Sequence, residues 1–255
     1  MKDIARRIIS SKKKFATILP TLRKGDVVTG IIPLRAGEEH ILLDLVERQI
    51  DIIPSATSQL ASRSKTFQAR ILNSWMLPQT SIIYDRHQLL EATNQFHSQK
   101  TSQVIVKQDR KNAGIGIFLY NSIEDVYNQS AGNTLIYPFV VQPFLQNSID
   151  IRVIMLGDYQ EAYKRDNPHS FRKNLHCGGH AQPYTLPSKA QNICSEVMTR
   201  GRFPYGHLDL MVAEDGSIFL AEINLHGGIR GASISTAEYK TRVKKIEKTL
   251  LAQFQ

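Results

Sequence analysis

Residues 207–224, HLDLMVAEDGSIFLAEIN, decide the fold because they read as two β-strands joined at Asp215-Gly216. Asp-Gly between two alternating apolar runs is a strong hairpin signal. A two-residue loop there places Asp209 opposite Glu222, with their Cβ atoms roughly 4.5–5.5 Å apart. The two carboxylates would repel unless a cation lay between them, and oxygens from Asp209, Glu222 and Asn224 suit Mg²⁺, which also takes phosphate oxygens. The pattern therefore indicates a magnesium–phosphate site, and a solvated sheet face carrying two acids is the alternative.

Composition limits the class of protein. The chain has 255 residues and a net charge of +9, enough length for one large domain or two small ones with a sizeable core. No apolar run approaches the ~18 residues of a membrane span, and residues 1–14 lack the apolar stretch of a secretory signal. Cys177 and Cys194 follow no metal-binding spacing, so we expect reduced thiols, a cytoplasmic location and no membrane association.

The first 25 residues carry much of the positive charge. Basic residues there are Lys2, Arg6, Arg7, Lys12, Lys13, Lys14, Arg23 and Lys24. One interpretation is an arm for nucleic acid or an acidic partner. The other, which we favour, is an amphipathic helix, because Ile4, Ile8, Ile9 and Phe15 recur at roughly helical spacing. We therefore treat residues 1–25 as a basic helix or arm.

The remaining pattern alternates strands and helices. Residues 26–60 predict a short parallel strand–helix–strand unit, with strands at 26–31 and 50–54 around a helix at 37–48. The change to a β-rich composition from residue 101 indicates a domain break near 98–102. Residues 150–165 predict a second hairpin, turning at Gly157-Asp158. Helices are expected at about 188–200 and 236–253.

Two further segments carry donors for an anion. Lys107 ends an apolar strand, and Gly114 and Gly116 follow it before a second strand begins. Glycines let backbone N–H groups approach a phosphate closely, although an ordinary glycine-containing hairpin would look the same. In the loop at 171–179, FRKNLHCGG, the side chains of Arg172, Asn174 and His176 alternate and could point to one side. A guanidinium matches phosphate geometry, whereas a polar surface loop would not explain so many donors.

Five segments, in order, resemble the ATP-grasp superfamily and within it the RimK-like group of S6 glutamate ligase-like enzymes. They are SRSK at 62–65, VIVKQDRKNAGIGIFL at 104–119, VVQPFLQNSIDIRV at 140–153, FRKNLHCGG at 171–179 and LDLM with AEIN within 208–224. The resemblance covers roughly residues 60–235. It implies an α+β ATP-grasp fold, in which two α+β subdomains clasp ATP, preceded by a truncated βαβ segment. Five ordered matches are far more specific than any single motif.

The resemblance also implies roles for residues. Nucleotide-binding positions would be Lys65, Lys107, Gly114, Gly116, Gln142, Pro143, Phe144, Asp150, Arg172 and Asn174. Two Mg²⁺ ions, or Mn²⁺ in their place, would be held by Asp209, Glu222 and Asn224. Catalytic roles would belong to Arg172, Asn174 and His176. The substrate would contact Arg152, Lys164, Arg165 and His226. The proton of the amine would go to Asp150, His207 or His226, among which the sequence does not choose.

Three departures from the family pattern matter. Pro143 stands where the family has a glutamate, but its carbonyl can still accept a hydrogen bond from an adenine amino group. The small residues that follow the metal asparagine in the family are replaced by Leu225-His226-Gly227-Gly228, which leaves the substrate open. The pre-ATP-grasp segment at 26–60 is short, so a partner protein could complete it. The ATP-grasp domain would span 61–255, with a lid at about 80–145, and such enzymes commonly form homo-oligomers.

The function implied is an ATP- and Mg²⁺-dependent carboxylate–amine ligase. A substrate carboxylate would be phosphorylated to an acyl phosphate, and an amine would then form the amide with release of ADP and phosphate. The partners would be a small molecule or peptide on each side. Two alternatives stay open: an ATP-grasp phosphotransferase without ligation, and a nucleotide-binding regulatory module that acts through the basic amino terminus.

Overall fold

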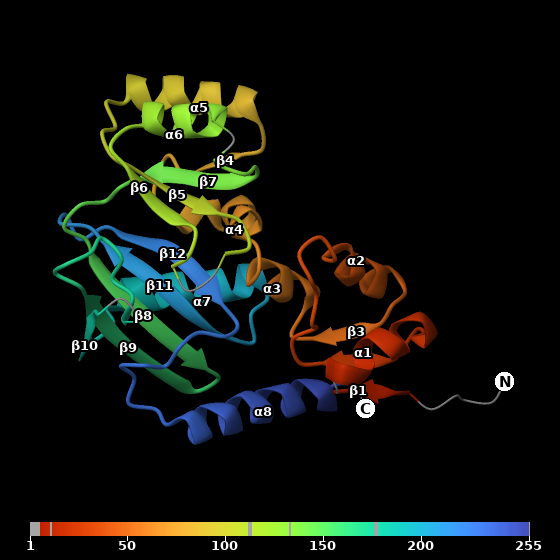
Figure 1. Cartoon of the computed structure of the whole chain (residues 1–255). Coiled ribbons are helices and arrows are strands. Elements are labelled where there is room, and N and C mark those ends of the chain that lie inside the picture. Colours follow the sequence, from red (N-terminus) through yellow and green to blue (C-terminus); the bar gives the residue numbers. More distant parts are fainter. Residues whose placement is uncertain (1–5, 11, 112–113, 133, 176–177, 255) are drawn as a thin grey trace.

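The computed structural model describes residues 6–10, 12–111, 114–132, 134–175 and 178–254. Figure 1 shows three parts: a small amino-terminal unit, a large central sheet with helices on one face, and a lid above it. Each part has its own apolar cluster. No helix in the described part of the chain has the length and apolar character of a membrane span.

The amino-terminal unit is a three-stranded parallel sheet in the order β1-β2-β3. Its elements are β1 Ile8–Ile9, α1 Lys12–Ile18, a 3₁₀ turn η1 Leu19–Thr21, β2 Val27–Thr29, α2 His40–Glu47 and β3 Asp51–Ile53. The predicted strand–helix–strand unit is confirmed. The expectation that Ile8 and Ile9 lie in an amphipathic helix is wrong, because they form a strand parallel to Val27 and Val28. Residues 6–25 therefore extend the unit at 26–60 instead of forming a separate arm.

The lid is a four-stranded antiparallel sheet in the order β4-β7-β5-β6, covered by two helices (Figure 1). Its elements are β4 Ser81–Ile83, α5 Arg86–Ser98, β5 Val104–Gln108, β6 Ile117–Tyr120, α6 Ile123–Ala131 and β7 Phe139–Pro143. The expected break at 98–102 is wrong, because Leu89 and Phe96 of α5 share one core with Val104 and Val106 of β5. The pattern changes from helix to strand there, but both elements bury their apolar sides together.

The central sheet is antiparallel, in the order β10-β9-β8-β11-β12. Its strands are β8 Ile149–Leu156, β9 Tyr159–Asp166, β10 His180–Pro183, β11 Tyr205–Val212 and β12 Ile218–Asn224. The helical elements associated with it are α3 Ala56–Ala61, α4 Lys65–Leu72, η2 Asn73–Trp75, α7 Ser188–Gly201 and α8 Thr236–Ala252. The pleat separates the two faces: Ile151 and Leu208 join the core with α7, whereas Asp150, Arg152 and Asp209 line a cleft on the other side.

The hairpin β11–β12 has the predicted partners but a different loop. Ala213 N–H donates to the Ser217 carbonyl, so the loop has three residues, and it ends with Gly216 at a positive φ of 80°. This is the other common hairpin geometry. The loop shifts the register by one residue, and a bulge at Ala221 shifts it back, so Asp209 still faces Glu222 and His207 faces Asn224.

Candidate active site

A cleft of about 700 Å³ lies between the lid and the central sheet, bounded by the loops at 171–175 and 226–230. This size is ordinary for a small-molecule site. The predicted residues that line it are Lys107, Gly114, Gln142, Pro143, Phe144, Asp150, Arg152, Arg165, Arg172, Asn174, Asp209, Glu222, Asn224 and His226. Residues distant in the sequence therefore meet in one place, as predicted. Lys65 and Gly116 are not among the lining residues, and His176 lies outside the described residues.

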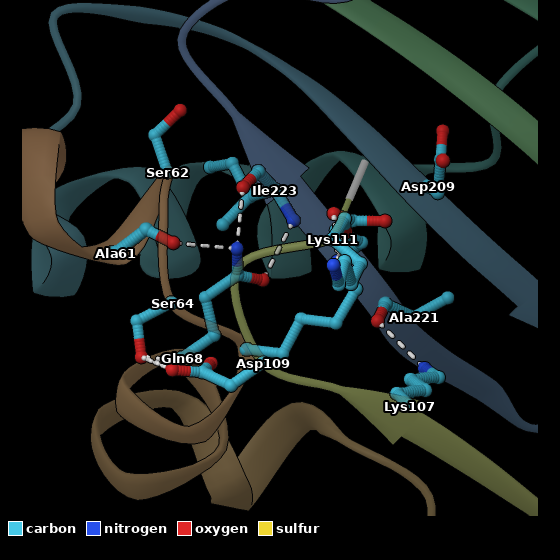
Figure 2. A network of polar contacts seen from close by, with 12 residues as sticks. Ala61, Ser62, Ser64, Gln68, Lys107, Asp109, Lys111, Asp209, Ala221 and Ile223 are labelled. Atoms are coloured by element: carbon cyan, nitrogen blue, oxygen red, sulfur yellow. Dashed lines mark hydrogen bonds and ion pairs between the residues drawn. The ribbon is translucent and has the colours of Figure 1, made fainter. Parts of the chain in front are cut away.

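Strand β12 of the central sheet is held by a lysine of the lid and a glutamine of α4. The Lys107 ammonium donates to the carbonyl of Ala221, the bulged residue, over 3.1 Å. The buried Gln68 amide of α4 hydrogen-bonds both backbone groups of Ile223, at 2.8 and 3.0 Å, and the Ala61 carbonyl at 2.7 Å (Figure 2). β12 is thus held by two side chains beside the acid pair, at the bulged Ala221 and at Ile223.

The flap, which we define as the described residues 109–111 and 114–116 of the β5–β6 connection, is held at its root. Asp109 accepts from the Ser64 hydroxyl at 3.0 Å and from the Thr66 N–H at 3.1 Å, at the amino end of α4. The Arg110 guanidinium pairs with Glu39 of the amino-terminal unit at 2.7 Å. The amino-terminal unit therefore touches the flap directly, a contact that the sequence did not reveal.

The glycine at the flap permits a close approach. Gly114 has φ +75°, and a Cβ there would lie 2.6 Å from the Asn174 amide nitrogen. The Arg172 guanidinium donates to the Ile117 carbonyl on β6 and stacks on Phe171 at 4.3 Å. The flap and the loop at 171–175 therefore pack against each other over the cleft, which needs a residue without a side chain at position 114.

Cations neutralise the acid pair. Asp209 receives two hydrogen bonds of 2.8 Å from Arg152 and lies 3.2 Å from Arg165, while Glu222 lies 3.5 Å from the Lys65 ammonium. Burial alone would raise the pKa of Asp209, but the two guanidinium groups outweigh it and hold that pKa well below its ordinary value. Asp209 is therefore a carboxylate at neutral pH.

Burial also sets the charge of Lys107 and Asp150. It lowers the pKa of Lys107 to about 8, although Glu222 opposes the shift. Burial raises the pKa of Asp150, and the charge of Arg165, whose guanidinium lies 2.5 Å from Asp150, only partly offsets it. Lys107 thus titrates close to neutral pH, where a small change of environment alters its charge.

Some predicted roles fit the geometry less well. Lys164 pairs with Ile151, which lies on the helix-covered face, and is not part of the cleft lining. Arg165 is 3% exposed and committed to Asp150 and Asp209, and Arg152 is committed to Asp209, so neither guanidinium is free to hold a substrate carboxylate alone. His207 is buried against the Tyr239 hydroxyl at 2.9 Å, and burial lowers its pKa to about 3. Of the three candidate acceptors for the amine proton, Asp150 and His226 line the cleft and His207 does not.

The backbone at Pro143-Phe144 also lines the cleft, but the Phe144 N–H already donates to the Gln103 carbonyl over 2.8 Å. Cleft residues that the sequence analysis missed include Ser62, Tyr163 and Arg230. The sequence could have indicated the position of Tyr163 through the predicted hairpin at 150–165. A turn at Gly157-Asp158 pairs Leu156 with Tyr159 and, further back along the hairpin, places Tyr163 opposite Arg152, as observed.

The donor set suits magnesium. Asp209, Glu222 and Asn224 offer only oxygen ligands, together with an amide nitrogen that can rotate away, and all three line the cleft. Within the described residues, the Asn224 amide has no side-chain hydrogen bond, and no three acidic, histidine or cysteine side chains form a ready metal site. Two carboxylates and an amide, completed by phosphate oxygens, are what Mg²⁺ commonly uses.

A family model described as the RimK-like ATP-grasp domain matches residues 61–246. The chain belongs to the RimK-like ATP-grasp family. The match covers the lid, the central sheet and every predicted site residue, and ATP-grasp ligases in general use ATP and Mg²⁺. No curated protein matches the sequence of this family member.

Solved structures support the fold at low identity. The D-alanine-D-alanine ligase from Coxiella burnetii has a TM-score of 0.63 at 12% identity, and the match covers 90% of this chain and 70% of the ligase chain. D-cycloserine synthetase DcsG has a TM-score of 0.62 at 14% identity, covering 90% and 84%. A Chryseobacterium gregarium RiPP-associated ATP-grasp ligase, solved with ADP and a leader and core peptide, has a TM-score of 0.58 at 14% identity, covering 89% and 76%. Their architecture is shared along most of this RimK-like chain.

Proposed function

We propose that this protein is an ATP- and Mg²⁺-dependent carboxylate–amine ligase. The observation that carries the proposal is that Asp209, Glu222 and Asn224 line the same cleft as the cations Lys107 and Arg172. This set suits a magnesium nucleotide, because the carboxylate and amide oxygens can bind Mg²⁺ while lysine and arginine neutralise the phosphates. The surplus of cations in the chain, +9 overall, suits anionic ligands.

The residues would divide the work by position. Lys107 and Arg172 would bind phosphate oxygens, and the flap at Gly114 would lie over them. Asp209, Glu222 and Asn224 would hold Mg²⁺, which supplies charge stabilisation on the phosphates. Catalysis of this kind depends on positioning and charge more than on covalent chemistry by the protein.

The reaction has two steps. A carboxylate oxygen attacks the γ-phosphorus, the bond to the β-phosphate bridging oxygen breaks, and ADP leaves. An amine then attacks the acyl carbon, the C–O bond to phosphate breaks, and an amide and inorganic phosphate form. Asp150 and His226 are the groups in the cleft that could take the amine proton.

The test uses hydroxylamine as a universal amine, because any acyl phosphate then yields a hydroxamate. Wild-type protein is incubated with MgATP, hydroxylamine and a panel of carboxylates, and ADP and hydroxamate are measured. We expect both products from at least one carboxylate, and a loss of at least 100-fold in Glu222→Gln, on the order of removing a group that stabilises transition-state charge. Glu214→Gln, at the exposed tip of the same hairpin, is the matched control and should keep its activity. Carboxylate-independent ADP release would count against ligation.

A further inference from the structure

One row of side chains crosses the cleft floor. Glu222 on β12, Asp209 on β11, Arg152 on β8 and Tyr163 on β9 occupy directly paired positions on four adjacent strands. All four line the cleft. Neighbouring strands are about 4.8 Å apart, so Tyr163 lies roughly 14 Å across the sheet from Glu222. If the acid pair marks the metal and phosphate end of the cleft, Tyr163 marks the opposite end.

The Tyr163 hydroxyl is buried without a partner. The residue is 1% exposed, and its hydroxyl has no hydrogen-bond partner within the described residues. An unsatisfied buried hydroxyl is costly, so such a group in a cleft indicates a ligand. The Arg152 guanidinium comes close enough to the hydroxyl to lower its pKa, but that contact does not have the geometry of a hydrogen bond. Arg152 instead donates to Asp209 and to the Gly228 carbonyl, and Arg165 is bound to Asp150 and Asp209. Burial raises the pKa of Tyr163, so the hydroxyl keeps its proton and remains a donor.

The ring is also fixed in place. Gly231 has φ +88°, and a Cβ there would lie 3.4 Å from the Tyr163 ring and 2.5 Å from the Ala181 methyl group. The loop that precedes it forms the wall of this end of the cleft, and Arg152 donates to the Gly228 carbonyl at 3.2 Å. Arg230 in the same loop is exposed and has no ion pair among the described residues. This end therefore offers one buried hydroxyl donor and one rim cation.

We propose that Tyr163 is a specificity-determining residue, whose hydroxyl donates a hydrogen bond to an oxygen of the carboxylate substrate other than the oxygens that react. The proposal rests on the proposed ligase function. The reacting carboxyl group lies toward Asp209 and Glu222, so the body of the substrate extends along the row to Tyr163. The substrate class is a carboxylic acid with a second oxygen acceptor, such as a hydroxyl, carbonyl or second carboxylate.

The test compares matched substrates in the hydroxamate assay. The panel contains unsubstituted acids of three to six carbons, their hydroxy, keto and dicarboxylate counterparts, and L-amino acids with their N-acetyl forms. Wild type should prefer the oxygen-bearing member of a pair. Tyr163→Phe should lose about 10- to 100-fold of that preference, the effect of a hydrogen bond to a polar or charged acceptor. Its kcat with the unsubstituted member and its affinity for MgADP should stay unchanged.

A second readout needs no substrate. Tyr163→Phe removes an unsatisfied hydroxyl, so the melting temperature of the free protein should stay equal or rise. Tyr159→Phe on the same strand is the matched control, because the Tyr159 hydroxyl donates to Glu161 at 2.6 Å outside the cleft lining. That variant should melt lower and keep the substrate preference.

Three results would overturn the inference. Equal preference in wild type and Tyr163→Phe, with hydroxamate formed by both, would reject Tyr163 and leave the ligase function standing. A lower melting temperature for Tyr163→Phe would show that the hydroxyl has a structural partner. Hydroxamate from no carboxylate in wild type would reject the proposed function and the inference with it.

Discussion

The affinity for MgADP should fall as the pH rises above 8, because Lys107 loses its proton there. Burial lowers the pKa of Lys107 from 10.5 to about 8. If the phosphates bind only the protonated ammonium, one proton must be present for binding. Lys107 is about ten-elevenths protonated at pH 7 and about one-eleventh at pH 9, so the dissociation constant should rise about tenfold between these values.

The titration of Lys107 also affects the stability of the fold. The folded pKa of Lys107 is lower than the unfolded one, so between about pH 8 and 10.5 the unfolded chain binds more protons than the folded chain. The contribution of Lys107 to the free energy of unfolding therefore rises with pH across that window and is least favourable below it. We expect Lys107→Met to have the higher free energy of unfolding at pH 7. Urea titrations at pH 7 and pH 9 should show that this difference from wild type becomes smaller, or changes sign, at pH 9.

The assay for affinity is isothermal titration calorimetry of MgADP from pH 6.5 to 9.5, in two buffers with different ionisation enthalpies. Proton uptake on binding should be close to zero at pH 6.5 and rise steadily toward one proton per MgADP at pH 9.5. Lys107→Arg is the control, because arginine stays charged throughout and should bind with little pH dependence. The reasoning is refuted if Lys107→Arg shows the same fall as wild type, since the titrating group would then be another residue.

Three further variants test the surroundings of the cleft. Gly114→Ala, at φ +75° and with its Cβ in a clash, should weaken MgADP binding at least tenfold; unchanged binding would mean that the flap can move aside at no cost. Gln68→Ala leaves three buried backbone groups unpaired and should cost about 3 kcal/mol in urea denaturation; a loss below about 1 kcal/mol would contradict its role as the tie to β12. Glu39→Gln breaks the partly exposed pair with Arg110 and should raise the MgADP dissociation constant about two- to fivefold. Asp44→Asn, within the helix α2 that Glu39 precedes, is the control for that change and should have no effect.

The sequence predicted which residues meet in the cleft better than it predicted the ion pairs between them. The hairpin rule placed Asp209 opposite Glu222 even though two of its details failed, because the three-residue loop and the bulge at Ala221 shift the register in opposite directions. The pairing of Asp209 with Arg152 was not predictable in this way. β8 and β11 are neighbours in the sheet but not consecutive in the chain, and a turn-based rule says nothing about such strands.

The amino-terminal strand shows a second limit. Ile8 and Ile9 are spaced from Phe15 as a helix would space them, but they form a strand because a parallel partner, Val27–Thr29, is available. Tertiary context overrides a short periodic pattern. Likewise, the contact of Glu39 with Arg110 joins residues 71 positions apart, and composition carries no trace of it.

The transfer of oxygen from the carboxylate to phosphate is the decisive test of the proposed ligase reaction. The carboxylate that yields hydroxamate is prepared with ¹⁸O in both carboxyl oxygens, and the inorganic phosphate released during turnover is analysed by mass spectrometry. In the proposed reaction one carboxyl oxygen attacks the γ-phosphorus and leaves with it when the amine displaces phosphate. We expect one ¹⁸O atom in each phosphate and one in the amide. Amide formed with release of unlabelled phosphate would contradict the proposed reaction.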